Sequence, residues 1–134
     1  MTIQATIKAQ DYSLLRRTLQ ANAIFSTLSG LLLTIGAQPV TEMLGLSASW
    51  VIFAVGLSLL PFAGFVYFVS RKAPLNRTAA TLILEGDILW VIASAVLLFS
   101  GWVQFSATGW WAVAIVADIV AVFAVLEWIG LRQK

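Results

Sequence analysis

The chain has 134 residues, 60% of them hydrophobic, and its mean hydropathy is +0.94. This composition lies well outside the usage of soluble globular domains. There is no cysteine and no histidine, which excludes disulfides and thiolate chemistry and removes the usual ligands of zinc and haem. We therefore expect an integral membrane protein that holds no metal or other cofactor and is not an enzyme.

Four apolar runs follow one another, near residues 18–37, 50–69, 78–99 and 110–128. Each has about twenty residues, the length of a helix that crosses a hydrocarbon core. The runs predict an all-α membrane protein in which residues 1–134 form one domain, an up-down bundle of four transmembrane helices. Residues 1–17 carry apolar side chains at near-helical spacing, which predicts either a short interfacial helix or a frayed terminus.

All the basic residues fall before the first run, between the second and third, or after the fourth. They are Lys8, Arg16, Arg17, Arg71, Lys72, Arg77, Arg132 and Lys134. The positive-inside rule then predicts that both termini and the middle loop are cytoplasmic, and we expect a bacterial inner membrane. These clusters are typical of topology signals that meet anionic lipid, so no nucleic-acid partner is expected.

Prolines and aromatic residues predict where the spans end. Pro39 is expected to close the first span, and a helical turn is expected to start at Thr41 in the loop that follows. Pro61 lies inside the second run, where it removes one backbone hydrogen bond and predicts a kink. Tryptophans near the span ends are typical of anchors at the two membrane interfaces; they are Trp50, Trp102, Trp110, Trp111 and Trp128.

Acidic residues interrupt the last two spans, which is costly in a membrane and often marks function. At 100° per residue, Asp87 shares a face with Ser94, and small and polar residues mark the packed faces of membrane helices. Asn22 marks such a face in the first span, at the same depth as Asp87. We predict that these two side chains meet in the half of the bundle nearest the cytoplasm.

The remaining polar residues are sorted by the same geometry. Tyr67 of the second span and Asp118 of the fourth are expected on interior faces. Glu85 lies about 200° from Asp87 and is expected to face lipid, where it reaches the membrane edge or pairs across a subunit contact. Glu127 lies about half a turn around the helix from Asp118 and is expected to form an interfacial ion pair, with Arg132 or with Arg16 or Arg17.

Two classes of function fit this pattern. The first is a small proton- or cation-coupled transport protein that acts as an oligomer, with the polar network Asp87, Asp118, Asn22, Glu85, Glu127, Ser94 and Tyr67 as candidate residues. The second is a non-catalytic accessory or assembly subunit of a larger membrane complex, including one that binds lipid or a pigment. Both predict the bilayer as surroundings and a second copy or another membrane protein as partner.

Overall fold

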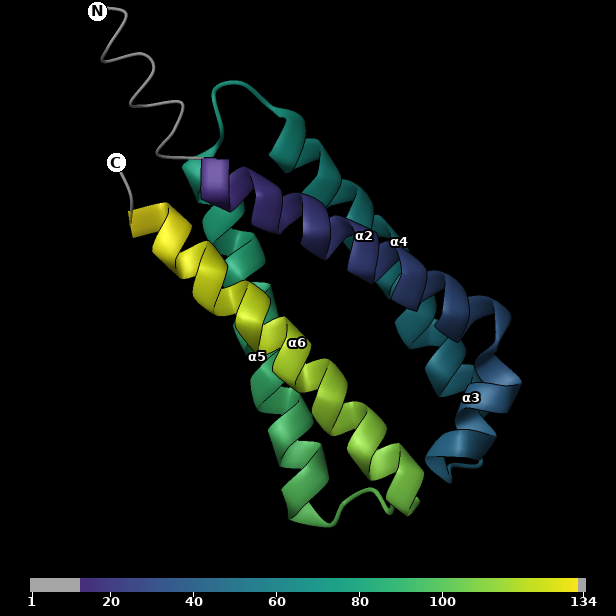
Figure 1. Cartoon of the computed structure of the whole chain (residues 1–134). Helices are drawn as coiled ribbons and strands as arrows, with labels where there is room; N and C mark the ends of the chain where they lie inside the picture. The colour runs from purple at the N-terminus through teal and green to yellow at the C-terminus, as the bar shows by residue number, and fades with distance from the viewer. Residues whose placement is uncertain (1–12, 133–134) are drawn as a thin grey trace, which may run out of the picture.

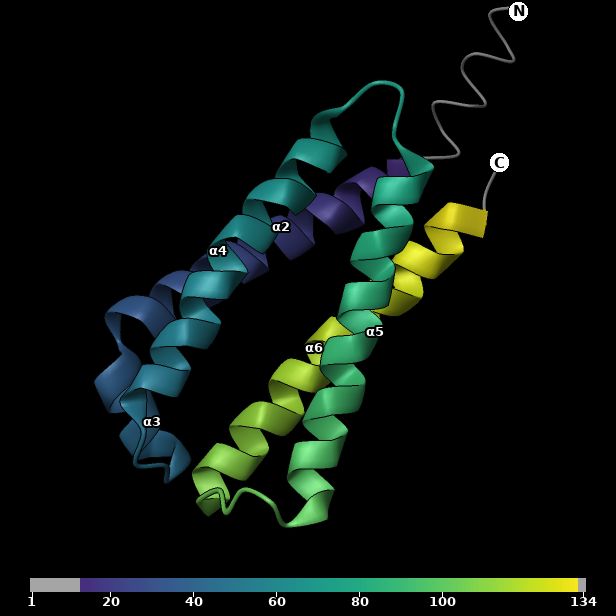
Figure 2. The same cartoon turned by 180° about the vertical axis from the view of Figure 1, so that it is seen from behind.

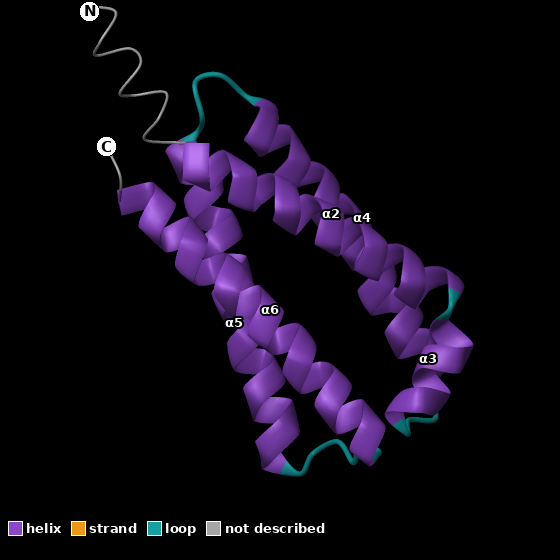
Figure 3. Ribbon diagram, viewed as in Figure 1, coloured by secondary structure: helices purple, strands orange, loops and turns teal. Residues whose placement is uncertain are grey.

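The computed structural model describes residues 13–132, which form five helices and, within that range, no strand. Figure 1 labels them, and Figure 3 shows that only short loops join them. The helices are α2 Ser13–Ile35, α3 Ala37–Leu44, α4 Ser49–Arg71, α5 Arg77–Ser100 and α6 Ala107–Arg132. All but α3 are long and apolar enough to span a membrane. The prediction of an all-α membrane protein with four spans is confirmed.

The helix ends differ from the predicted ends in two places. Residues 13–17 belong to the first span itself, because α2 begins at Ser13, and the rest of the predicted interfacial segment lies outside the described residues. Pro39 does not close the first span: α2 ends at Ile35, and Pro39 lies in the first turn of α3. A proline is tolerated there because first-turn N–H groups have no partner within the helix.

The spans pair as two antiparallel hairpins, α2 with α4 and α5 with α6 (Figures 1 and 2). The start of α2, the loop between α4 and α5, and the end of α6 lie together at one end of the bundle (Figure 1). We call this the basic end. It carries the described basic residues, which are Arg16, Arg17, Arg71, Lys72, Arg77 and Arg132. At the opposite end, α3 lies beside the start of α6.

Two glycines allow α2 and α4 to approach closely. A Cβ atom on Gly56 would lie 2.7 Å from the backbone nitrogen of Thr34, and one on Gly30 would lie 3.1 Å from the Gly56 carbonyl oxygen. Without a strong hydrophobic drive between helices in lipid, such close backbone packing is a main source of association. Gly56 is therefore a residue on which the first hairpin depends.

Replacing Gly56 with alanine is expected to destabilise the protein by about 1–3 kcal/mol, because the backbone of α2 must shift to admit the new methyl group. Gly64 supplies the matched control on the same helix, since a Cβ there meets nothing within 4 Å. Thermal unfolding in detergent should show a lower midpoint for Gly56→Ala than for wild type. For Gly64→Ala the midpoint should be unchanged or slightly higher. Equal midpoints for the two variants would refute the close packing at Gly56.

The two hairpins are joined at both ends. At the basic end, α6 crosses α2 so closely that a Cβ on Gly130 would lie 2.8 Å from the Leu15 Cβ. At the opposite end, Ser106 caps α6 by accepting from Gly109 N (2.9 Å), and its hydroxyl donates to the Met43 carbonyl oxygen of α3 (2.6 Å). Between these two joints, a cavity is lined by residues of both hairpins.

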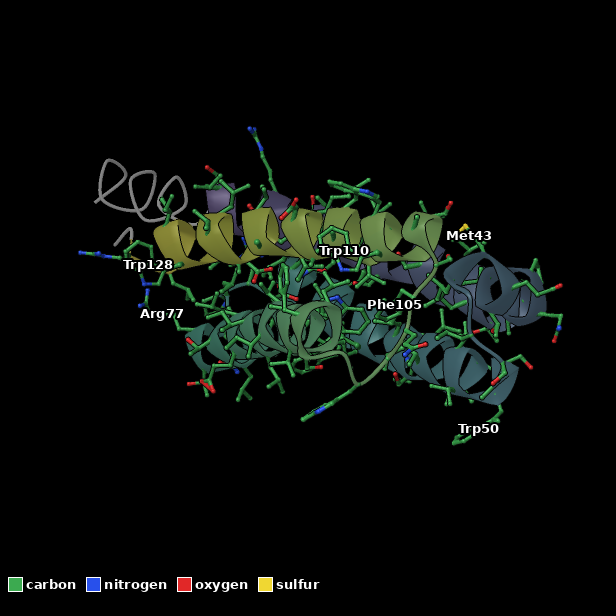
Figure 4. The ribbon with its side chains drawn as sticks, turned by 90° about the horizontal axis from the view of Figure 1, so that it is seen from below. Met43, Trp50, Arg77, Phe105, Trp110 and Trp128 are labelled. Atoms are coloured by element: carbon green, nitrogen blue, oxygen red, sulfur yellow. The ribbon has the colours of Figure 1, made fainter. Side chains whose placement is uncertain are left out.

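Apolar side chains cover the outer surface, as expected of a protein in lipid. Figure 4 shows Arg77 and Trp128 at one end and Met43 and Trp50 at the other. The Arg132 guanidinium lies over the Trp128 ring at 4.7 Å, and Trp50, Trp102 and Trp111 are exposed. Exposed tryptophans near both ends of the spans match the interfacial anchors that the sequence predicts.

Candidate functional site

A buried polar cluster joins three of the four spans. Asn22 Nδ2 donates one hydrogen bond to Asp87 Oδ2 (2.8 Å) and another to Glu127 Oε2 (2.9 Å). The exposed fractions of the three side chains are 2%, 4% and 0%. One amide group carries two N–H donors, so Asn22 uses both to hold one carboxyl group from α5 and one from α6. We call these three residues the Asn22 cluster.

The face of α2 that bears Asn22 is built from polar side chains. Thr18, Asn22 and Ser26 lie one turn apart and are buried. Ser26 Oγ donates to Asn22 Oδ1 (3.0 Å), which fixes the amide with its N–H groups toward the carboxyl groups. Thr18 instead donates to the Leu14 carbonyl oxygen of its own helix (2.8 Å). The orientation of Asn22 is thus set by its neighbour one turn away.

The acids of the cluster have no basic partner among residues 13–132. Arg16 donates to the Ser70 carbonyl oxygen (2.9 Å), and Glu127 Oε1 is buried without a hydrogen-bond partner within the described range. The Asp87 and Glu127 carboxyl groups lie near each other, because both accept from the same amide nitrogen of Asn22. A hydrogen bond between two carboxyl groups needs a proton on one of them, and two adjacent ionised carboxylates repel each other. The geometry therefore suits one proton, or one cation, shared by the pair.

A cavity of about 370 Å³ lies beside the cluster, between the two hairpins. Asn22 and Asp87 form part of its wall, whereas Glu127 does not. Most of the wall is apolar. The lining side chains outside the cluster are Phe25, Ser26, Ser29, Leu32, Leu33, Ser58, Leu59, Phe62, Trp90, Val116 and Val120, with Gly86. Asp87 thus connects a buried acid pair to a partly open cavity within the membrane-spanning region.

The other polar residues singled out in the sequence do not join the cluster. Ser94 is buried about two turns further along α5, away from the Asn22 cluster. Glu85 is exposed on α5, on the lipid-facing side that its spacing predicts. Tyr67, expected in the interior, is 51% exposed; its hydroxyl accepts from Arg71 Nη1 (3.0 Å) at the basic end.

The positions of Asp118 and Glu127 reverse the prediction for α6. Glu127 is fully buried in the Asn22 cluster and not in an ion pair with Arg132, which stacks on Trp128 instead. Asp118, expected in the interior, lies on the exposed side of α6. The two acids lie about half a turn apart, so only one of them can face the other helices. Glu127 is the acid that faces them, and the prediction for these two residues is wrong.

The small residues of α6 were the signal that could have found Glu127. Its buried face carries Gly109, Ala117, Ala124 and Gly130, in register with Glu127. Small residues mark packed faces in membrane helices, so these four predict that the face of Glu127 is packed. The face that carries Asp118 also has small residues, Ala114 and Ala121, so small residues alone do not separate the two faces as clearly as the buried glycines do.

No group of three or more acidic side chains that could hold a metal ion is found within residues 13–132. The fold and the site together define the class of protein: an integral membrane protein whose four spans enclose a buried Asn–Asp–Glu cluster. Comparison with protein-family models, with curated proteins and with solved structures gives no match.

Proposed function

We propose that this protein is a small proton-coupled transport protein in which Asp87 and Glu127 share the coupled proton. The observation that supports this is the donation of both Asn22 N–H groups to two buried acids that have no basic partner among the described residues. Acids buried in membrane spans are typical of proton relays in pumps and transporters. The adjoining cavity gives Asp87 a route for exchange with a transported solute.

The proposal includes an oligomer, because four spans enclose little volume. The cavity volume of about 370 Å³ is at the small end of the range for ligand sites. If two copies form the transport path together, one copy does not need a continuous path of its own. In this proposal the chain carries out no catalysis. The group that holds the acid pair is the Asn22 amide of α2, which does not titrate.

Proton flux into liposomes tests this function directly. The purified protein is reconstituted into vesicles that contain a pH-sensitive dye. A mixture of candidate solutes is held at a higher concentration inside the vesicles than outside, which gives an outward gradient. Wild type is expected to acidify or alkalinise the interior, and Glu127→Gln is expected to reduce that rate to the level of protein-free vesicles. A Glu127→Gln rate equal to that of wild type would contradict the shared proton.

A second candidate function is favoured by the exposed acid of α6. Asp118 lies about 17 Å along the helix from Ala107 and about 21 Å from Arg132, so it is near the middle of the span and faces outward. An acid facing lipid at that depth is costly, and a neighbouring protein would remove the cost. This favours an accessory subunit of a larger membrane complex, with Asp118 at the contact.

Copurification separates the two candidates. If the protein is an accessory subunit, mild detergent extraction from its native membrane should recover a complex that contains other chains, and Asp118→Leu should weaken that complex. If it is a transport oligomer, cross-linking should give multiples of its own mass alone. Recovery of a monomer with no neighbour would contradict both the oligomer and the accessory subunit.

We further propose that the basic end faces the cytoplasm, as the positive-inside rule predicts. The chain has no cysteine, so single-cysteine variants report one site each. In intact cells, a membrane-impermeant maleimide should label Ser47→Cys, in the exposed turn before α4, and should label Ala73→Cys only after the cells are opened. Labelling of Ala73→Cys in intact cells would reverse the topology.

A further inference from the structure

The cavity beside the Asn22 cluster has a composition that selects a particular class of ligand. Three aromatic side chains, Phe25, Phe62 and Trp90, line it together with aliphatic residues. Its acidic wall residue is Asp87, which is 4% exposed. A site with apolar walls and one buried acid favours a molecule that is apolar over most of its surface and positively charged at one point.

We propose that the cavity binds an amphipathic organic cation, such as a quaternary or protonated amine with an apolar body. This inference rests on the proposed function, because it names the class of solute that the transport protein carries. Aromatic faces attract cations, and this attraction is strongest where water is excluded. A metal ion would need several oxygen ligands, whereas the wall offers mostly carbon atoms.

The charge balance of the cluster links this ligand to the proton. With one proton shared, the acid pair carries a single negative charge. When the cation enters, the proton leaves, and the pair then carries two negative charges beside one positive charge. The net charge within the cavity is the same before and after, so exchange avoids the cost of changing the buried charge. One proton should therefore be released for each cation bound.

Glu127 Oε1 is a second observation that favours a cation. This oxygen is buried and has no hydrogen-bond partner among residues 13–132. A buried carboxyl oxygen without a donor is unfavourable, and positive charge at the neighbouring Asp87 would stabilise it. The cluster is thus arranged to gain from a cation at the cavity wall.

Binding of a matched pair of probes tests the inference. Benzyltrimethylammonium carries the charge, and neopentylbenzene has the same shape with carbon in place of nitrogen. In nanodiscs of phosphatidylglycerol, with empty nanodiscs as the blank, we expect saturable binding of the cation, no competition by the neutral probe, and release of one proton for each cation bound.

Three variants locate the site. Asp87→Asn should weaken cation binding at least tenfold and abolish proton release. Gly86→Leu should weaken binding similarly by filling the cavity, because the nearest side-chain atom to a Cβ at Gly86 is Phe62 Cε1 at 3.6 Å. Asp118→Asn, on the exposed side of α6, should leave binding unchanged.

The results distinguish this inference from the proposed function. Suppose that proton flux depends on Asp87, but the cation does not bind or the neutral probe competes equally with it. The ligand class is then wrong, and proton coupling stands. If the cation binds with Asp87 dependence but no proton-linked flux is found, the ligand class stands and the transport function is wrong. Unchanged binding in both Asp87→Asn and Gly86→Leu would overturn the inference.

Discussion

Replacing Asp87 with asparagine is expected to abolish proton-linked flux while leaving the fold intact. The amide keeps the shape of the carboxyl group, and its oxygen can still accept the hydrogen bond from Asn22. It cannot ionise, so the cavity wall loses its acid and Glu127, which does not line the cavity, is the one acid left in the cluster. Flux measured in liposomes should fall to the level of protein-free vesicles, with an unfolding midpoint close to that of wild type.

Asp118→Asn is the matched control for this variant. It makes the same chemical change on an acid that lies outside the cluster and the cavity. Its flux should be close to that of wild type. Normal flux in Asp87→Asn would remove the proton-coupled function and leave the accessory subunit as the better candidate.

Replacing Asn22 with leucine is expected to cost about 3–5 kcal/mol of stability. The substitution removes the donor from two buried acids at once, and breaking a buried polar pair leaves charge or lone pairs without compensation. Thermal unfolding in detergent should show a large fall in the midpoint. Ser26→Ala, which removes only the bond to Asn22 Oδ1, should cost about 1 kcal/mol.

An apolar version of the whole cluster provides the counter-test. In a triple variant, Asn22→Leu with Asp87→Leu and Glu127→Leu, no polar group is left without a partner. Replacing a buried polar network with apolar residues of similar volume is often neutral or stabilising. The triple variant should therefore regain most of the stability that Asn22→Leu loses, yet carry no proton flux. A triple variant less stable than Asn22→Leu would show that the cluster is needed for folding itself.

The spans and one contact of the site could be predicted from the sequence. Membrane spans need about twenty apolar residues, so the four long helices were found, with ends within a few residues of those observed. Asn22 and Asp87 lie about 14 and 15 Å along their helices from the basic end, and each belongs to a stripe of small or polar residues. Depth and face together predicted that they meet, and their hydrogen bond is present.

The rest depended on packing that periodicity does not record. The rotation of α6 about its axis decides whether Asp118 or Glu127 enters the bundle, and it is set by the close contact of Gly130 with Leu15. The cavity exists because the hairpins are joined at their ends and separate between them. Gly130 and Leu15 lie far apart in the sequence, so no spacing rule could reveal their contact. The same holds for the residues that line the cavity.

The central claim is that Asp87 and Glu127 share one proton, and infrared spectroscopy tests it most directly. The spectrum is recorded at neutral pH in a background where Glu85 and Asp118 are replaced with their amides, so that these span acids add no signal. A carbonyl band of a protonated carboxylic acid should be present, should be lost when Asp87→Asn and Glu127→Gln are combined, and should weaken when benzyltrimethylammonium binds. The absence of any such band in the parent protein would contradict the account.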